Sequence, residues 1–262
     1  ARTDATIPME SNNLIVIKQR YIWRLNNHRI LAQASHEKYR KLGEKISPTQ
    51  KINSKMLRKY CFMTQKGILA FSGGLDTSVV VKYLQEEHDM EVITVTVDVG
   101  QGDDAKKIAI KAKKLGVKKH YNIDARKEFV DDYIFPAIKA NALYQKKYCL
   151  ATALARPLIA EKVLEIAKKE KVTSLAHGCS GKGNDQVRFD ITLRSGSDLP
   201  IIAPIRDLNL DRETELKFAK KHGIEIDNVA KKFSIDQNLW GRAIEGGVLE
   251  NPYNEPPDDA FI

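Results

Sequence analysis

Short apolar runs alternate with amphipathic stretches between residues 67 and 222. Each run is bounded by glycine or polar turns, which favours a buried strand, and the stretches between them place apolar residues on one helical face. Strands separated by helices imply βαβ units, so we expect an α/β fold with a doubly wound parallel sheet and helices on both faces. The predicted strands are Gly67–Phe71, Val92–Val97, His120–Ile123, Ser174–Ala176 and Pro200–Ala203, and the predicted helices end near Glu87 and Gly116 or span 127–140, 154–169 and 212–222.

Residues 1–62 follow a different pattern. Their apolar residues show no sustained period among Asn, Gln, Ser and basic residues, so we expect a basic, weakly ordered leader. The stretch 14–31 could form a basic helix in a translocation leader or an RNA-binding arm. Alternatively the leader is an artefact, because the chain begins with Ala1 while Met63 stands just before the first predicted strand and is the expected true start.

The basic excess belongs to this leader. Residues 1–62 hold 13 Lys and Arg against 4 Asp and Glu, which equals the formal net charge of +9 of the whole chain. The remainder is therefore balanced, and the charge is no argument for nucleic-acid binding by the main domain.

Cysteine spacing and hydropathy exclude further classes of protein. Cys61, Cys149 and Cys179 lie far apart without a C-x-x-C pair, which argues against a zinc cage or a disulfide framework and favours reduced thiols in a cytoplasmic protein. No apolar run approaches the roughly 18 residues of a membrane span. We expect neither a membrane association nor export.

A glycine-containing loop follows the first predicted strand. In the segment 72–78, S-G-G-L-D-T-S, two glycines allow close backbone approach to an anion, Ser72 and Ser78 offer hydroxyls, and a helix begins near Asp76. Phosphate binding is the natural use, although a tight turn with an Asp or Thr cap would also explain two isolated glycines. The spacing excludes a Walker A loop.

The complete string resembles the pyrophosphate loop of the ATP pyrophosphatase group, which has an adenine nucleotide alpha hydrolase-like fold. That resemblance implies cleavage of ATP between the α and β phosphates. It also implies a loop that holds the departing pyrophosphate with Mg2+, and a carboxylate, Asp76, that caps the helix and organises the phosphate site.

A second glycine-containing segment follows the fourth predicted strand. Gly178, Gly181 and Gly183 make a flexible loop, and Lys182 can neutralise phosphate charge. Close by in the sequence, Arg188 suits a carboxylate and Asp185 an ammonium group, as amino-acid head groups require. Each of these residues alone could be a surface cap or ion pair, and it is their density that favours a site.

Four segments together resemble argininosuccinate synthases in order and spacing. They are 98–101 (D-V-G-Q), 148–157 (Y-C-L-A-T-A-L-A-R-P), 177–189 (H-G-C-S-G-K-G-N-D-Q-V-R-F) and 234–250. The resemblance implies three parts: the leader 1–62, an ATP-binding domain 63–228, and the incomplete beginning of an α+β synthetase and oligomerisation domain at 229–262. The implied reaction joins citrulline to aspartate in arginine biosynthesis through a citrullyl-adenylate, and releases AMP and pyrophosphate.

The resemblance also implies roles for individual residues. Asp76 and Lys182 belong to the phosphate site, no residue acts as a nucleophile, and His177 is structural or contacts the nucleotide. The ligands of the metal are left open. The implied contacts are Ala70, Phe71, Ser72, Gly73, Gly74, Leu75, Asp76, Thr77, Ser78, Val97 and Gly178 for ATP; Tyr148, Asn184, Arg188 and Ser234 for citrulline; and Ser180, Asn184 and Asp185 for aspartate.

The sequence departs from the family in two respects. Ala153 and Ala243 stand where the family often has a citrulline-contacting serine, and each lost hydroxyl could weaken citrulline binding by about 0.5–1.5 kcal/mol. The chain also ends soon after the second domain has begun, so we expect a truncated chain that is nearly inactive alone, without the elements that make full-length members homotetramers. The alternatives are an ATP-binding fragment without catalysis and, more remotely, a tRNA-modifying relative that uses the leader as an RNA arm.

Overall fold

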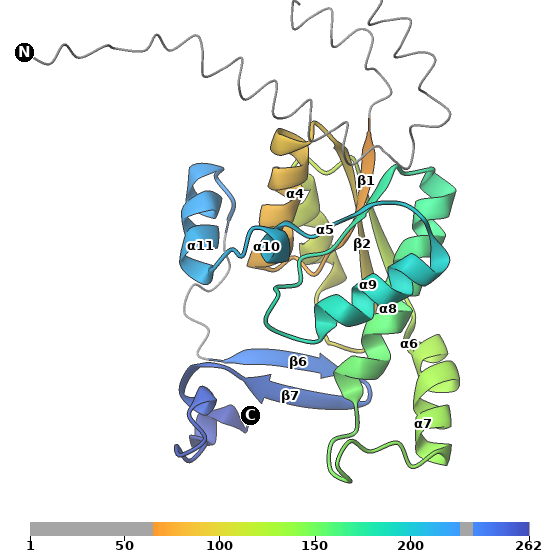
Figure 1. Ribbon diagram of the computed structural model, residues 1–262, viewed down its shortest axis with the longest axis vertical. Coiled ribbons are helices and arrows are strands. Elements are labelled where there is room, and N and C mark those ends of the chain that lie inside the picture. The colour runs from red at the N-terminus through yellow and green to blue at the C-terminus, as the bar shows by residue number, and fades with distance from the viewer. Residues whose placement is uncertain (1–64, 226–232, 262) are drawn as a thin grey trace, which may run out of the picture. The chain divides into compact units, whose positions relative to one another are not determined.

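The computed structural model of the protein describes residues 65–225 and 233–261, drawn in colour in Figure 1. The expected leader 1–62, its candidate helix 14–31 and the expected domain boundary at 228 lie outside the described residues. Within the described ranges, no helix is both long and apolar enough to cross a lipid bilayer.

The centre of the structure is a parallel sheet of five strands in the order β3-β2-β1-β4-β5. The chain moves outward from β1 to β2 and β3, and then crosses back to add β4 and β5 on the other side of β1. This reversal confirms the doubly wound prediction and places a topological switch point between β1 and β4. The strands are β1 Lys66–Ala70, β2 Glu91–Asp98, β3 Lys119–Asp124, β4 Ser174–Ala176 and β5 Ile201–Ile202.

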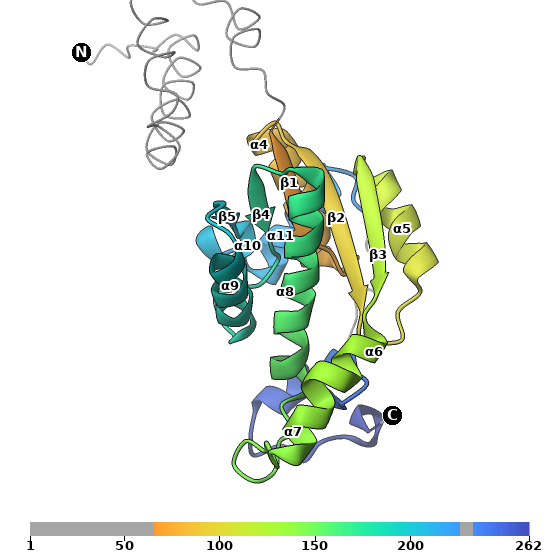
Figure 2. The same cartoon turned by 90° about the vertical axis from the view of Figure 1, so that its right-hand side faces the viewer.

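Helices cover both faces of this sheet, because successive side chains of a strand point to opposite sides. On β1, Ile68 packs in the cluster with α8 and α9, whereas Leu69 packs in the cluster with α4, α5, α10 and α11. Figure 2 shows α8 in front of the strands, with α9 and α5 toward opposite edges. The helices are α4 Leu75–Glu87, α5 Ala105–Lys114, α8 Ala151–Glu170, α9 Asp185–Gly196, α10 Pro204–Asp207 and α11 Arg212–Lys221.

The helix predicted at 127–140 is present but is not uniform. It consists of α6 Arg126–Glu128, a π-helical segment Phe129–Ile134 and α7 Phe135–Lys139. Pro136 lacks an N–H and its ring would collide with the carbonyl four residues earlier, so wider turns before it relieve the clash. The N–H of Phe135 accordingly donates to the carbonyl of Val130, five residues back.

Helix α9 is not among the helices predicted from the sequence, where Asp185 and Arg188 were assigned to one short loop with the three glycines. The loop ends at Asn184, which occupies the N-cap position, and Asp185 and Arg188 lie on the first turn of α9. Three glycines dominated the sequence pattern, while the apolar contacts of this helix come only from Phe189 and Leu193, four residues apart on one face.

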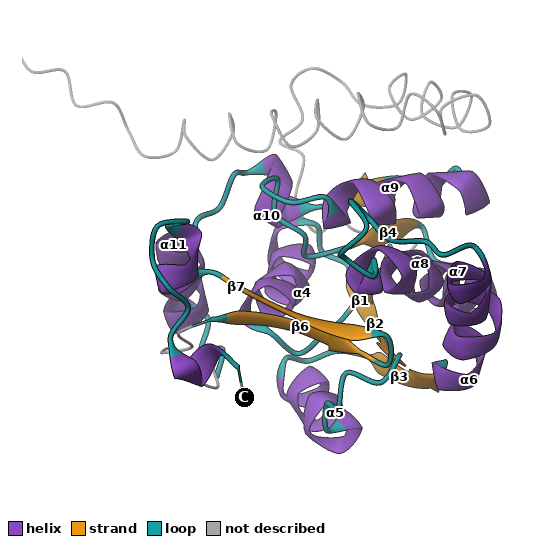
Figure 3. Cartoon of the chain, turned by 90° about the horizontal axis from the view of Figure 1, so that it is seen from below, coloured by secondary structure: helices purple, strands orange, loops and turns teal. Residues whose placement is uncertain are grey.

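A hairpin of two antiparallel strands, β6 Ser234–Asn238 and β7 Gly241–Glu245, lies at the carboxyl ends of the parallel strands (Figures 1 and 3). The backbone N–H of Leu239 at its turn donates to the carbonyl of Val99, just beyond β2, at 3.0 Å. Its strands are mostly polar, so no apolar run in the sequence predicts them. The chain after the hairpin forms the short helices Gly247–Glu250 and Asp258–Ala260.

We expect Leu158→Ala to lower the free energy of unfolding by about 2–5 kcal/mol, because it leaves a cavity between α8 and the sheet. Leu158 is 0% exposed. The matched control is Leu208→Ala, since Leu208 is 50% exposed and its loss leaves no cavity. Urea unfolding followed by circular dichroism measures both variants, and equal effects of the two would contradict the described core.

Candidate functional site

Two loops meet at the switch point between β1 and β4. The first, residues 72–78, comprises the turn after β1 and the first turn of α4, and is called the phosphate loop below. The second, residues 177–184, joins β4 to α9 and is called the second loop. Because Leu69 pairs with Ala176 in adjacent parallel strands, both loops leave the same edge of the sheet side by side. The structure thus brings together the two segments that the sequence singled out.

The start of the phosphate loop is fixed by β2. The Thr96 hydroxyl donates to the carbonyl of Phe71 at 2.5 Å, and the N–H of Phe71 donates to the carbonyl of Val95 at 2.8 Å. Gly73 then turns the chain at φ +76°, in the left-handed region that glycine adopts readily. The Ser78 hydroxyl is buried and donates to the carbonyl of Gly74 at 2.7 Å, so it stabilises the loop instead of facing a ligand.

Helix α4 presents an uncapped N-terminus. Its N-cap is Gly74, which has no side chain to accept the first N–H groups. The expectation that Asp76 caps the helix is therefore wrong, because Asp76 lies within the first turn, where a carboxylate interacts favourably with the helix dipole. The free N–H groups of the first turn remain available for an anion. Beside them, the exposed Ser72 hydroxyl accepts the N–H of Gly74 at 3.3 Å.

Gly178 allows the second loop to touch this helix N-terminus. A Cβ atom at Gly178 would lie 3.0 Å from Cγ2 and 3.2 Å from the backbone nitrogen of Thr77. Any side chain there would push the second loop away from the phosphate loop. Gly183, in the same loop, has open space around it, so the constraint is specific to Gly178.

A buried histidine holds the second loop in shape. His177 is 1% exposed, and its Nδ1 accepts the N–H of Cys179 at 3.2 Å. The proton therefore resides on Nε2, which lies 2.9 Å from Oδ1 of Asp190. Burial lowers the pKa of His177. Burial raises the pKa of the Cys179 thiol to about 12, so neither group is suited to proton transfer or nucleophilic attack near neutral pH.

Asp190 continues this network to α10, because its Oδ2 accepts from Nη1 of Arg206 at 3.0 Å. Burial alone would raise the pKa of Asp190, but the hydrogen bond from His177 and the charge of Arg206 outweigh burial and lower it. The chain of Cys179, His177, Asp190 and Arg206 thus fixes the second loop against α9 and α10. These contacts support a structural role for His177.

The guanidinium group of Arg156 connects the start of α9 to the hairpin. Nε of Arg156, on α8, donates to Asp185 at 2.8 Å, and its Nη2 donates to Asp236 of β6 at 2.6 Å. Arg188 donates to the other oxygen of Asp185 at 2.6 Å. Burial would lower the pKa of Arg156, but the two carboxylates outweigh burial and raise it. Asp185 and Arg188 thus contact each other directly, and Arg156, to which no role was assigned from the sequence, connects Asp185 to the hairpin.

The hairpin turns one face toward α8. Asp236 contacts Arg156, and the side-chain amide of Asn238 donates to the carbonyl of Ala151 at 2.9 Å. Alternation along the strand puts Ser234 on this same face, and Ala243 shares it because it pairs directly with Asp236. Ser234 and Ala243, both linked to citrulline by the resemblance, therefore share the hairpin face that contacts α8, although Ser234 is exposed.

Tyr148 lies just before α8 and helps to begin it. Its hydroxyl accepts the N–H of Thr152 at 3.3 Å, which explains why α8 starts a turn earlier than predicted. Among the described residues, neither Tyr148 nor Ser234 makes a side-chain hydrogen bond to the phosphate loop or the second loop. Asn184, Lys182 and Ser180 lie in the second loop itself, and Asn184 and Lys182 are exposed.

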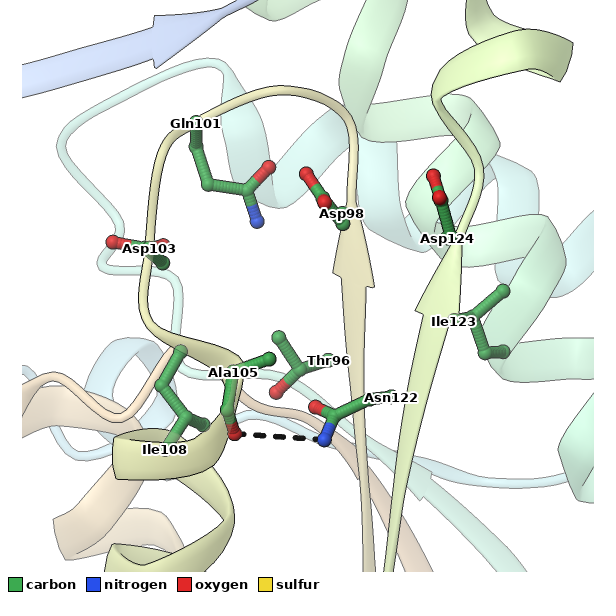
Figure 4. A pocket seen from close by; sticks show the side chains of 9 residues that line it. All are labelled: Thr96, Asp98, Gln101, Asp103, Ala105, Ile108, Asn122, Ile123 and Asp124. Carbon is green, nitrogen blue, oxygen red and sulfur yellow. Dashed lines mark hydrogen bonds between the residues drawn. The ribbon is translucent and has the colours of Figure 1, made fainter.

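A cavity of about 170 Å³ opens beside the carboxyl ends of β2 and β3 (Figure 4). Asp98 and Asp124 line its rim, and Asn122 donates to the carbonyl of Ala105 on the far side at 3.5 Å. Val97 does not open into it, since its side chain packs in the core below α8. Its carbonyl accepts from Gln101 at 2.9 Å, so a ligand could reach Val97 only through the backbone.

Four residues that shape this site carry no motif that assigns them a role from the sequence. They are Arg156, Asp190, Arg206 and Glu215, and all four act through contacts between elements distant in the chain. Only Glu215 leaves a local signal, because it stands one turn before Ala219 on the buried face of an otherwise charged helix.

Comparison with known proteins identifies the family. The profile of the arginosuccinate synthase N-terminal HUP domain matches residues 66–225, and that of the arginosuccinate synthase C-terminal domain matches residues 233–262. The chain belongs to the argininosuccinate synthase family. The first match covers more than half of the chain and includes both loops, which confirms the resemblance seen in the sequence and an adenine nucleotide alpha hydrolase-like fold.

Individual argininosuccinate synthases agree with this assignment. Those of Methanothermobacter thermautotrophicus and Pyrococcus furiosus are 60% and 57% identical over 75% and 74% of this chain, which covers 49% and 47% of their lengths. The chain thus spans about half the length of the curated relatives it matches. Among solved structures, a predicted subunit of tRNA methyltransferase from Methanocaldococcus jannaschii aligns with 19% identity and a TM-score of 0.41 over 60% of this chain and 74% of its own.

We expect Gly178→Ala to weaken ATP binding by about tenfold or more, because a clash of this kind costs about 1–3 kcal/mol when backbone must move. The added methyl group would separate the second loop from the first turn of α4. Isothermal titration calorimetry with ATP and Mg2+ measures the loss. Gly183→Ala is the control and should bind as the unaltered chain does, so equal losses in both variants would argue against the close contact.

We expect Arg156→Ala to release the hairpin, since it removes two charge-assisted hydrogen bonds worth about 1.5–3 kcal/mol each. Hydrogen–deuterium exchange should become faster in residues 234–245 and in the first turn of α9. Arg242→Ala, which removes an exposed arginine of the same hairpin, serves as the control. Unchanged protection of 234–245 in Arg156→Ala would show that the ion pairs do not hold the hairpin.

Proposed function

We propose that this chain supplies the nucleotide site and the acceptor site of an argininosuccinate synthase, which joins citrulline and aspartate at the expense of ATP. The observation that carries the proposal is the contact of Gly178 with the N-terminus of α4. That contact puts an anion-binding helix end beside a loop that leads directly into Asp185 and Arg188. Phosphate chemistry and amino-acid recognition thereby share one edge of the sheet.

The phosphates of ATP would lie against the phosphate loop. The free N–H groups of the first turn of α4 donate to phosphate oxygens, and Lys182 of the second loop adds a positive charge. Ser72 and Gly73 complete this side of the site, while Phe71, Leu75, Thr77 and Ser78 support it from below as buried residues. The adenine end would extend toward Gly178 and the backbone of Val97.

The amino-acid substrates would bind at the start of α9. Asp185 accepts one hydrogen bond at each oxygen from Arg156 and Arg188, and a carboxylate keeps further lone pairs for an ammonium group. Arg188 uses one of its five N–H donors on Asp185, so the others remain for a substrate carboxylate. We assign aspartate to Ser180, Asn184 and Asp185, and citrulline to Asn184, Arg188, Tyr148 and Ser234.

The proposed reaction has two steps. The ureido oxygen of citrulline attacks the α-phosphorus of ATP, pyrophosphate leaves, and the amine of aspartate then displaces AMP from the citrullyl-adenylate. Placement of the reactants and neutralisation of phosphate charge supply the acceleration, as expected where no side chain acts as a nucleophile. The neutral, doubly hydrogen-bonded His177 and the high thiol pKa of Cys179 are consistent with such a mechanism.

Mg2+ would accompany the phosphates. The described residues contain no group of three or more His, Cys, Asp or Glu side chains that could hold a metal ion. The phosphate oxygens and water would therefore be its main ligands, which is usual for Mg2+ at nucleotide sites. We also propose a cytoplasmic location, supported by the free thiols of Cys149 and Cys179.

The test is mass-spectrometric detection of argininosuccinate with ATP, Mg2+, citrulline and aspartate, and with each substrate omitted in turn. We would assay this chain as it stands and joined to the C-terminal region of the Methanothermobacter relative. ATP binding is expected in both, and product that requires all three substrates in the joined protein. ATP binding without citrulline-dependent pyrophosphate release in either protein would refute the ligase and leave a nucleotide-binding domain.

A further inference from the structure

A buried carboxyl group lies beside the phosphate loop without an assigned role. Glu215 of α11 is 4% exposed, and its Oε2 has no hydrogen-bond donor among the described residues. An ionised carboxylate in such a place is costly, because neither water nor a cation replaces its lost hydration. The group is thus unlike Glu213 of the same helix, which is exposed and pairs with Lys217 at 2.7 Å.

Glu215 has an acidic neighbour in Asp76, on the first turn of α4. Three charged groups face it. Asp76 from α4 and Asp211 from the start of α11 are negative, and Arg212 is positive. Arg212 is partly exposed and lies 3.7 Å from Asp76. Burial first and Asp76 second raise the pKa of Glu215 to about 8, and the attraction of Arg212 only partly offsets them.

Two carboxyl groups can share a hydrogen bond only if one of them carries the proton. Glu215 is the buried member and Asp76 the half-exposed one, so the proton belongs to Glu215, whose neutral form costs less to bury. A protonated Glu215 would have an O–H to donate to the carboxylate of Asp76. With that proton on Oε2, the oxygen that lacks a donor would become a donor itself.

We propose that Glu215 is a positioning residue of the phosphate loop, which fixes Asp76 and the first turn of α4 by acting as a neutral hydrogen-bond donor. The inference rests on the proposed function only in that ATP is the ligand of this loop. Helix α11 packs on α4 through Ala219, so the O–H bond joins the end of that contact to the phosphate site. Loss of the proton would set two carboxylates against each other under the helix end that binds phosphate.

The primary test measures ATP affinity by calorimetry between pH 7.5 and 9.5 in Glu215→Gln, Glu215→Ala and the control Glu213→Gln. Glu213→Gln shows how much the ionisation of ATP and of lysine changes the affinity, and should match the unaltered chain. In the unaltered chain and in Glu213→Gln, we expect the affinity for ATP to fall by about tenfold or more across this range, because Glu215 loses its buried proton with a pKa of about 8. Glu215→Gln keeps a neutral donor and should hold its affinity, while Glu215→Ala should be weak throughout.

A second measurement needs no ligand. Above its ordinary value of 4.5 and up to about 8, Glu215 keeps a proton in the folded chain that the unfolded chain has released. The free energy of unfolding therefore falls as pH rises through this window, and above it Glu215 adds no further pH dependence. The melting temperature of Glu215→Gln relative to Glu213→Gln should rise steadily from pH 5 to pH 8 and stay level from pH 9.

The outcomes separate the two proposals. The positioning role would be supported if Glu215→Gln keeps its ATP affinity while Glu215→Ala loses it, and if the difference in melting temperature rises with pH. A Gln variant as weak as Ala, or a melting difference that is constant with pH, would overturn it. Absence of ATP binding by the unaltered chain would refute the proposed function, and the melting curves would still decide whether Glu215 holds its proton.

Discussion

The arrangement of the site depends on one guanidinium group held between two carboxylates. Arg156 projects from α8, Asp185 begins α9, and Asp236 lies on the hairpin strand β6. The Arg156 side chain is 22% exposed, and without it each carboxylate would lose its cation in partly buried surroundings. The planar fork of arginine binds both acceptors at fixed angles, which a lysine could not do. The same ion pairs therefore orient an acceptor residue and dock the hairpin.

The phosphate side follows a different principle, in which close backbone approach replaces charge. Thr96 fixes the end of β1, Gly73 turns the chain, and Gly178 lets the second loop reach the helix N-terminus. His177 then keeps the second loop in place by using both ring nitrogens. Glycines and the N–H groups of the first turn of α4 therefore form much of this end, where an anion can bind.

Much of the fold could be predicted because it rests on local patterns. Short apolar runs identified every strand of the parallel sheet, and 174–176 was located to the residue. The phosphate loop could be found because its glycines and hydroxyl residues are consecutive in the sequence. The hairpin and α9 could not be predicted, because β6 and β7 are polar and α9 buries only Phe189 and Leu193. Their positions depend on Arg156 and on Asn238, whose partners are distant in sequence.

The residues missed in the site share a physical cause. Asp190 and Arg206 look like surface charges in the sequence, and only the crossing of α9 and α10 brings them to His177. Asp76 was expected to cap its own helix, yet its position in the first turn places it 3.7 Å from Arg212 of another helix. Tertiary packing thus decides which charged residues are structural, and this packing cannot be read from a single sequence.

The turn of the hairpin also gives the protein an optical reporter. The indole N–H of Trp240 donates to the carbonyl of Cys149 at 2.6 Å, and the thiol of Cys149 contacts the carbonyl of Trp240 at 3.7 Å. Trp240 packs against the core, and Gly241 is small enough to sit on Cys149. Only one other tryptophan, Trp23, occurs in the chain. With Trp23 replaced by phenylalanine, the emission of the remaining indole would report directly whether the hairpin is seated on the domain.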